Sequence, residues 1–264
     1  MQVQTVSLRR DNYAYLLIDE PSAQVVVVDP SDAAPIIKTL ESQQLGLTQI
    51  WCTHHHGDHV GGVQELVQRY QPAHVVASSF DLQQRRIPCQ THGLEERSGW
   101  RLGNHEVTVY DVPGHTLGAV AYLVNGMLFT GDVLFVAGCG YLFEGTPQQM
   151  WKSLSRLGGL EGSIRFYCGH EYTLANLAFA KSLEPQNTAI DAKIVQVKGL
   201  RANGLPSVPS TLMQELEFNP FLRCEHPSVI AAAQRLSPEL RGDDAAQVFQ
   251  VIRQAKDQFR ASLS

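Results

Sequence analysis

The segment THHHGDH at residues 53–59 holds four of the ten histidines of the chain and one aspartate. His54 and His56 lie two residues apart, so in an extended chain their side chains project from one face, while the histidine between them points the other way. Asp58 and His59 follow in a glycine-containing turn, and imidazole nitrogen and carboxylate oxygen are ligands that zinc and similar cations take readily. The alternative is an exposed polar loop, which leaves this density of ionisable groups unexplained. The segment therefore predicts a metal-binding loop.

One short loop cannot supply the ligands of two metal ions, so further ligands are expected elsewhere in the chain. His115 in VPGHTLG, Asp132 in FTGDVLF and His170 in YCGHEYT each follow a glycine at the end of a predicted strand. Glycine permits tight turns and close backbone approach, which suits a side chain aimed into a site. Each residue alone is more typical of a cap or a turn, but their common setting predicts one shared site.

Short strands and occasional helices must position these residues in the first two-thirds of the chain. Apolar segments bounded by turn residues predict strands, of which the first two are expected to pair, at residues 13–19, 24–30, 50–53, 74–78, 105–113, 119–124, 126–132 and 164–169. Helical periodicity dominates after about residue 171. Helices are predicted at residues 31–44, 63–70, 147–160, 173–185, 189–202, 227–236 and 245–259. The sequence thus predicts an α/β region followed by a smaller helical one.

The composition excludes several classes of protein. A chain of 264 residues with 44% hydrophobic and 18% charged residues is typical of a globular protein, and a net charge of −5 argues against a nucleic-acid partner. The strongest apolar run, Val25 to Val28, is too short to cross a bilayer, and the N-terminal residues lack the apolar segment of a signal peptide. Five scattered cysteines without a CxxC pair predict buried thiols in a reducing compartment. We expect a soluble, cytoplasmic protein with no membrane partner.

The motifs THHHGDH, VPGHTLG, FTGDVLF and YCGHEYT, in this order and spacing, resemble the metallo-β-lactamase superfamily. The resemblance is closest to glyoxalase II, the hydroxyacylglutathione hydrolases. The resemblance extends to GCGYLFEGT at residues 138–146, NPFLR at residues 219–223 and IRQAKDQF at residues 252–259, so it covers nearly the whole chain. It implies a four-layer αββα sandwich followed by a smaller helical domain. By this resemblance residues 1–170 form the metal-binding catalytic domain and residues 171–264 a helical substrate-binding domain.

The same resemblance assigns the ligands of two divalent metal ions per chain. One ion is expected to be bound by His54, His56 and His115, and the other by Asp58, His59 and His170. Asp132 would bridge the two, since a carboxylate has two oxygens and can contact two cations. The resemblance gives Asp58 and Asp132 their catalytic role through these metals, with a metal-bridging hydroxide as the nucleophile. Zinc is the expected metal, with iron or manganese as the alternatives.

The activity implied by the resemblance is hydrolysis of glutathione thioesters of the S-lactoylglutathione type. The products are glutathione and a 2-hydroxy acid, and the reaction is the second step of methylglyoxal detoxification. The alternatives are another hydrolase of the same fold, such as a β-lactamase, lactonase, esterase or phosphodiesterase, or a mononuclear-iron persulfide dioxygenase. A non-catalytic metal-binding protein is the alternative from a different class. The expected partner is a small glutathione thioester, and the expected state is a monomer.

Glutathione carries two carboxylates, so an acidic protein needs a local cationic patch to bind it. Arg253 and Lys256 lie three residues apart on a predicted helix and share a face. The resemblance assigns these two residues and Tyr172 to glutathione. It also marks a departure, because Tyr141 stands after GCG where the family usually has arginine or lysine, and Phe143 stands where some members have tyrosine. We therefore expect a weaker hold on the glutathione part of the substrate than in members with the cation.

Overall fold

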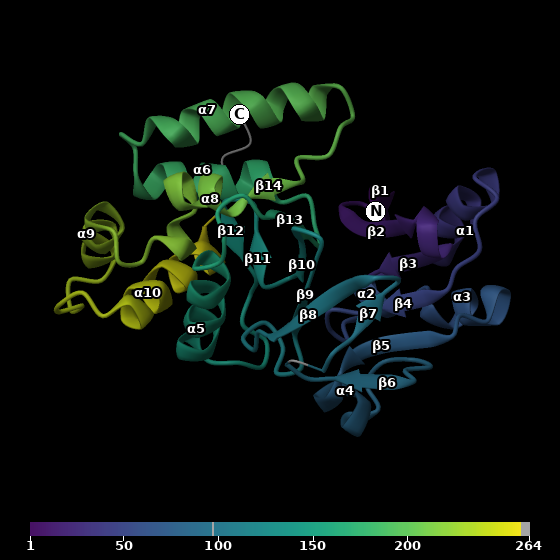
Figure 1. Ribbon diagram of the computed structural model, residues 1–264. Coiled ribbons are helices and arrows are strands. Elements are labelled where there is room, and N and C mark those ends of the chain that lie inside the picture. The colour runs from purple at the N-terminus through teal and green to yellow at the C-terminus, as the bar shows by residue number, and fades with distance from the viewer. Residues whose placement is uncertain (97, 260–264) are drawn as a thin grey trace. The chain divides into compact units, whose positions relative to one another are not determined.

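The computed structural model describes residues 1–96 and 98–259, and the chain divides into two compact units (Figure 1). Unit 1 is made of Met1–Asp111, Leu117–Gly131 and Tyr167–Glu171, and unit 2 of Val112–Thr116, Asp132–Phe166 and the residues from Tyr172 onward. The units differ from the predicted segments 1–170 and 171–264, because two stretches before residue 170 belong to unit 2. The division into a catalytic and a substrate-binding domain stays a prediction, and its residues 260–264 lie outside the described residues.

The first sheet of unit 1 combines an antiparallel and a parallel half. Its strand order is β1-β2-β3-β4-β5-β6, where the strands are Gln2–Leu8, Asn12–Asp19, Gln24–Val28, Gln49–Trp51, His74–Ser78 and His92–Leu94. β1 to β3 pair antiparallel, which confirms the predicted pairing of residues 13–19 with 24–30, and β3 to β6 run parallel. The links between the parallel strands contain α1 to α4, which are Ala33–Ser42, Gly57–Val60, Val63–Tyr70 and Ser79–Gln84.

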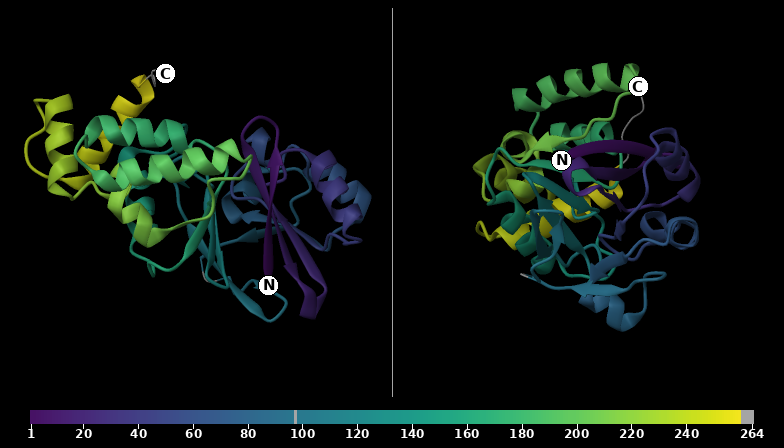
Figure 2. Two further views of the ribbon diagram at one scale, coloured as in Figure 1. Left: turned by 90° about the horizontal axis from the view of Figure 1, so that it is seen from above. Right: turned by 45° about the vertical axis from the view of Figure 1, so that its right-hand side comes forward.

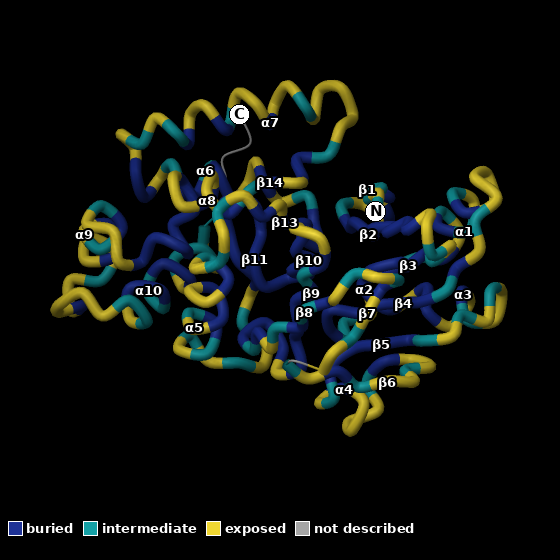
Figure 3. Tube along the Cα trace, in the orientation of Figure 1, coloured by how far each residue is buried: buried dark blue, intermediate teal, exposed yellow. Residues whose placement is uncertain are grey.

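Strand β2 is buried along its whole length because it has hydrophobic neighbours on both faces (Figure 3). Leu16 and Ile18 belong to the core cluster that this sheet forms with α1 and α3. Tyr15 points to the opposite face, where its ring centroid lies 5.5 Å from that of Phe129 and 5.2 Å from that of Tyr167. Each such fully buried side chain contributes about 1.5–3 kcal/mol to the stability of the fold. One face of β2 therefore packs with α1 and α3, and the other face packs against residues of the second sheet.

The second sheet of unit 1 lies on the side of the first sheet away from α1 and α3 (Figure 2). The order β10-β9-β8-β7 is antiparallel, with strands Met127–Gly131, Val120–Val124, His105–Asp111 and Arg101–Leu102. The end of β13 (Arg165–Cys168) lies beside the end of β10, and the amide of Gly169 donates to the carbonyl of Gly131 over 2.9 Å. Trp51 and Tyr122 pack between the two sheets with centroids 5.2 Å apart. The predicted strands of this region are confirmed.

Unit 2 is mainly helical. Its helices α5 to α10 are Pro147–Gly158, Thr173–Leu183, Thr188–Ala202, Leu212–Phe218, Pro227–Leu236 and Ala245–Gln258. Phe221, in the 3-10 turn η2 (Pro220–Leu222), packs against Phe179 of α6 and Phe249 of α10 with centroids 6.0 and 5.8 Å apart. The unit also contains the two-stranded sheet β11 (Leu134–Phe135) and β12 (Gly138–Cys139), and β14 (Ser210–Thr211), which pairs with the start of β13.

Most helices of unit 2 were expected from the sequence, whereas the short strands and α8 were not. The start of α5 shows why the prediction succeeds: Thr146 and Gln149 form a capping box, and Pro147 occupies the first turn, where its missing N–H costs nothing. Among the described residues, no helix has the length and apolar character needed to cross a membrane.

Candidate metal centre

The histidine-rich loop connects the end of β4 to α2 in unit 1. Nε2 of His54 lies 3.2 Å from Nδ1 of His56, so these two rings converge as the spacing predicts. His55 turns elsewhere, and its Nδ1 lies 3.9 Å from Oδ1 of the buried Asp81. The loop follows a parallel strand at its carboxyl end, which is the edge where α/β sheets place their ligands.

Asp58, His59 and His170 form a second group in unit 1. Oδ2 of Asp58 lies 3.4 Å from Nε2 of His170 and 4.0 Å from Nε2 of His59. One ligand atom from each of the three residues lies within 4.8 Å of the others, a spacing compatible with one metal ion. Asn12 donates to the Asp58 carbonyl over 2.9 Å and thereby fixes the backbone of this ligand. The structure brings together three residues that the resemblance assigns to one ion.

The outer nitrogens of these histidines are held by oxygen atoms of neighbouring side chains. Nδ1 of His59 lies 3.0 Å from Oδ2 of Asp29, and Nδ1 of His170 lies 2.9 Å from Oδ1 of Asp11. Such a partner fixes the tautomer and the ring orientation of a metal-binding histidine and raises its basicity. In both residues Nε2 is the atom that faces Asp58. The arrangement is compatible with a metal site.

Sequence reasoning missed Asp29 and Asp11. Asp29 also accepts from the backbone amide and the hydroxyl of Thr53, each over 2.7 Å, and the same hydroxyl lies 3.0 Å from Nδ1 of His54. One buried carboxylate thus orients two histidines of the loop. Its position directly after the apolar run of β3 is a signal of the same kind as those from which Asp132 and the other ligands at strand ends were predicted.

His115 and Asp132 are the predicted metal ligands that lie in unit 2. Nε2 of His115 lies 3.6 Å from Oδ2 of Asp132, and both side chains are buried. Nδ1 of His115 lies 2.7 Å from the carbonyl oxygen of Tyr141, so that this ring is also held by its outer nitrogen. The partner here is a backbone carbonyl and not a side chain. The donor atoms of both units, imidazole nitrogen and carboxylate oxygen, suit zinc, iron or manganese.

Two of the predicted substrate contacts form an exposed aromatic pair in unit 2. Tyr141 and Phe143 are 49% and 65% exposed, and their ring centroids lie 4.8 Å apart. The ring of Phe143 also lies 5.3 Å from that of His115. Tyr172 is partly exposed and packs edge-on against Phe135 of β11. The pair thus adjoins a predicted metal ligand within the same unit.

Arg253 and Lys256 are both on α10, as predicted, but their side chains have different surroundings. Arg253 is only 7% exposed, and its guanidinium donates to the Cys139 carbonyl over 2.8 Å and to Asp257 over 2.8 and 3.1 Å. Lys256 donates to the Ala175 carbonyl over 3.1 Å, and burial, together with the neighbouring Arg253 charge, lowers the pKa of its amine to about 8. Their assignment to glutathione stays a prediction, and Lys256 is the more accessible of the two.

Two family models match the chain. The model described as hydroxyacylglutathione hydrolase C-terminus matches residues 171–259, and the model of the metallo-β-lactamase superfamily matches residues 9–84. The first covers the helical part from α6 onward, and the second contains the histidine-rich loop and Asp29.

Curated relatives extend the similarity to almost the whole chain. A hydroxyacylglutathione hydrolase of Photobacterium profundum is 42% identical over 259 residues, which are 98% of this chain and 100% of that protein. A hydroxyacylglutathione hydrolase of Methylobacillus flagellatus is 45% identical over 249 residues, which are 94% of this chain and 96% of that protein.

Solved structures show the same fold. The BLEG-1 B3 metallo-β-lactamase matches with a TM-score of 0.63 and 23% identity, over 84% of this chain and 99% of that one. ETHE1 from Myxococcus xanthus matches with a TM-score of 0.65 and 23% identity, over 97% of this chain and 100% of that one. The predicted four-layer αββα fold with a helical C-terminal region is confirmed. Given identities above 40% over nearly the full length, the chain belongs to the hydroxyacylglutathione hydrolase family of the metallo-β-lactamase superfamily.

Proposed function

We propose that the protein is a metal-dependent thioester hydrolase that converts glutathione thioesters of the S-lactoylglutathione type into glutathione and a 2-hydroxy acid. This reaction is the second step of methylglyoxal detoxification. The observation that carries the proposal is the pattern of held histidines: the outer nitrogens of His59, His170 and His115 each have an oxygen partner, while their Nε2 atoms face a carboxylate. Relatives with this activity in their names match nearly the full chain.

The proposed metal content is two divalent ions per chain. The residues that would hold them are those that the family resemblance assigns: His54, His56 and His115 for one ion, Asp58, His59 and His170 for the other, and Asp132 for both. Metals bound there would lower the pKa of a coordinated water toward neutrality and polarise the thioester carbonyl. Zinc suits the donors, and iron remains an alternative because TTHA1623, 25% identical and similar with a TM-score of 0.60, is described in a di-iron-bound form.

The residues of the chain contribute orientation and charge. Asp29 and Asp11 hold two histidines in the tautomer that leaves Nε2 available for a metal. A thiolate is a good leaving group, since a free cysteine-type thiol has a pKa of about 8.5, so the reaction does not demand a strong general acid. The amine of Lys256 supplies a positive charge for a glutathione carboxylate below about pH 8, where it is protonated.

The decisive test is thioester hydrolysis by the purified protein, with the metal content measured on the same sample. We expect release of free thiol from S-lactoylglutathione, two metals per chain after metal-supplemented expression, and loss of both in an Asp132→Ala variant. Hydrolysis of lactones, phosphodiesters or simple esters without thioesterase activity would instead indicate another hydrolase of this fold. Oxygen consumption with glutathione persulfide and a single iron per chain would indicate a persulfide dioxygenase.

The monomeric state and the cytoplasmic location stay predictions. Light scattering coupled to size-exclusion chromatography of the metal-loaded protein checks the first, with a mass near 29.2 kDa expected for a monomer. Fractionation of the source cells checks the second.

A further inference from the structure

A buried hairpin in unit 2 connects the predicted bridging ligand to the carbonyl that holds His115. β11 begins two residues after Asp132, and β12 ends two residues before Tyr141. The turn between the strands consists of Val136 and Ala137, which are inaccessible to solvent, and Ala137 has a φ of 56°. A non-glycine residue in this region is strained, so surrounding structure must hold it there.

Three buried side chains bind the polar backbone groups of this turn. The amide of Ala137 donates to Oε2 of Glu215 over 2.7 Å. Nδ2 of Asn219 donates to the carbonyls on both sides of the turn over 3.1 and 3.2 Å, and Nδ2 of Asn176 donates to the carbonyl of Val136 over 3.1 Å. Buried backbone groups without such partners would be costly, so these side chains determine where the turn can lie.

Glu215 of α8 is the centre of this arrangement. Its carboxyl group is completely buried, and besides the Ala137 amide it accepts from the Ser210 hydroxyl over 2.7 Å and from Asn219 over 3.0 Å. The nearby Lys193 donates to Gln214 and lies over the Phe218 ring, so it is not a direct partner of the carboxylate. Burying a carboxyl group is unfavourable unless its oxygens are satisfied, and here the satisfying groups belong to the hairpin and to α8 itself.

The hairpin is close to both predicted ligands of unit 2, because Asp132 precedes its first strand and Tyr141 follows its second strand by two residues each. The amide of Gly140 donates to the carbonyl of Val133, and a Cβ atom at Gly140 would lie 1.9 Å from the carbonyl oxygen of Asp132. The next residue, Tyr141, provides the carbonyl that lies 2.7 Å from Nδ1 of His115. A displaced hairpin therefore moves the backbone of one ligand and the outer partner of the other.

We infer that Glu215 is a positioning residue for the metal ligands Asp132 and His115, because it anchors the β11–β12 hairpin that carries the backbone on which both depend. The inference rests on the proposed function only in taking these two residues as ligands. Glu215 touches neither the substrate nor the metal, and its effect is exerted through the Ala137 amide and the Asn219 side chain.

The test compares three variants of the metal-loaded full chain. Glu215→Ala removes all three hydrogen bonds, and we expect faster metal release into a chromogenic chelator, with the about 10–100-fold effect of losing a direct outer partner of a ligand as the upper bound. Glu215→Gln should stay close to the unmodified protein, because its amide oxygen can accept from Ala137 and its amide nitrogen can donate to Ser210. For the thioester, kcat should fall in Glu215→Ala while KM changes little.

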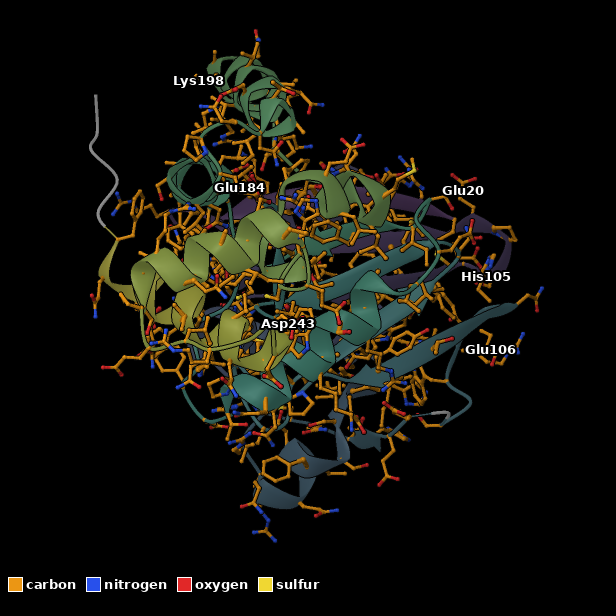
Figure 4. The ribbon with its side chains drawn as sticks, turned by 90° about the vertical axis from the view of Figure 1, so that its left-hand side faces the viewer. Glu20, His105, Glu106, Glu184, Lys198 and Asp243 are labelled. Atoms are coloured by element: carbon orange, nitrogen blue, oxygen red, sulfur yellow. The ribbon has the colours of Figure 1, made fainter. Side chains whose placement is uncertain are left out.

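Glu184→Ala is the matched control for general loss of stability. Glu184, labelled in Figure 4, is also a buried carboxylate of unit 2. It binds Arg223 and Ser228, neither of which belongs to the hairpin. We expect this variant to melt at a lower temperature and yet release metal at the unmodified rate. Should Glu215→Ala not fold, Asn176→Ala, which removes one hydrogen bond of the same turn, should still accelerate release by about three- to tenfold.

Two results would overturn the inference. One is a folded Glu215→Ala protein, or Asn176→Ala protein, that releases metal at the unmodified rate. The other is equally fast release from Glu184→Ala, which would assign the effect to stability alone. Failure of the proposed function is distinguishable, because an unmodified protein that binds metal but leaves S-lactoylglutathione intact refutes the activity while the release rates still decide the role of Glu215.

Discussion

The predicted metal ligands of unit 1 and those of unit 2 are held in different ways. In unit 1 the outer partners of His59 and His170 are the carboxylates of Asp29 and Asp11. In unit 2 the partner of His115 is a backbone carbonyl. A side-chain partner can be replaced without moving the backbone, whereas a carbonyl keeps its place only if the backbone does. The orientation of His115 therefore depends on residues such as Glu215, which hold the main chain before Tyr141 and do not contact His115 themselves.

The largest expected effect tests whether the two groups of ligands serve one centre. Asp132→Ala should reduce kcat/KM for S-lactoylglutathione by about 10³-fold or more, since metal catalysis contributes several kcal/mol. It should also lower the metal content more than His59→Ala or His115→Ala does, because a bridging carboxylate serves both ions. Elemental analysis and thioester kinetics on the same samples check this. Full metal content and activity in Asp132→Ala would show that the residue is not a bridge.

The next largest effect is expected when the carboxylates that hold the histidines of unit 1 are replaced. Asp29→Ala should weaken metal affinity by about 10–100-fold, because it removes the partner of His59 and the anchor of Thr53 at once. Asp11→Ala should cost less, since Asp11 has one ligand partner and is partly exposed. Competition with a chelator of known affinity measures both. Asp29→Asn is the control for backbone strain. Asparagine also tolerates the φ of 51° at this position, so a loss of affinity in this variant comes from the missing carboxylate and not from the backbone.

In unit 2, a pH-dependent effect is expected at the buried carboxyl group of Glu215. Burial raises the pKa of Glu215 from 4.5 to about 7, so the folded protein keeps a proton that the unfolded chain has lost. The contribution of this group to the free energy of unfolding is therefore fully present below pH 4.5 and is lost as the pH rises through about 7. Glu215→Gln cannot ionise, so between about pH 5 and about pH 8 its stability should improve relative to the unmodified protein, by up to about 3 kcal/mol. Urea unfolding at both pH values checks this, with the exposed Glu217→Gln as control.

Substrate binding gives a smaller effect that is confined to unit 2. Since the pKa of Lys256 is lowered to about 8, chiefly by burial, its charge is present below that pH and lost above it. KM for S-lactoylglutathione should therefore rise severalfold as the pH passes about 8, and Lys256→Met should show the higher KM at all pH values, consistent with about 0.2–1 kcal/mol for a screened ion pair. Lys198→Met, on the exposed side of α7, is the control (Figure 4). If KM does not change in Lys256→Met, the amine of Lys256 does not bind the substrate.

The smallest effect concerns the exposed aromatic pair. Tyr141→Arg should lower KM about two- to fivefold at low salt and less at high salt, because it adds a screened charge next to the predicted glutathione contacts. Its backbone carbonyl still serves His115, so kcat should stay unchanged. Phe143→Tyr adds a hydroxyl without charge, and its effect should not depend on salt. A salt-independent gain in Tyr141→Arg would contradict an electrostatic origin.

The candidate ligands could be proposed from the sequence because each is a polar residue of the right type near the end of an apolar strand, and their role as ligands stays a prediction. Their outer partners could not all be found in this way. Asp29 and Asp11 have the right type, but only the folded sheet brings them to His59 and His170. The carbonyl of Tyr141 has no sequence signal at all, since every residue carries one.

The fold was predictable where elements are long and periodic, and it was missed where they are short. β11 and β12 have two residues each, so no alternation can develop, and Ala137 takes a positive φ without the glycine that would indicate a turn. Arg253 illustrates a different limit. Its spacing from Lys256 correctly placed both on one helix, but the charge concealed that Arg253 lies in the buried stripe beside Ile252.

The hydrogen bond from Arg253 to the Cys139 carbonyl has a consequence for the order of events during synthesis. Arg253 leaves the ribosome about 120 residues after Asp132, which is roughly 6 to 24 seconds later at about 5–20 residues per second. Throughout that interval the β11–β12 hairpin of the nascent chain lacks its contact with α10. Until Glu215 has also been synthesised, it lacks the hydrogen bond to that carboxyl group as well. We therefore expect the hairpin beside the predicted ligands His115 and Asp132 to gain all its contacts only when translation is nearly finished, whereas Asp29 is already present when the histidine-rich loop emerges.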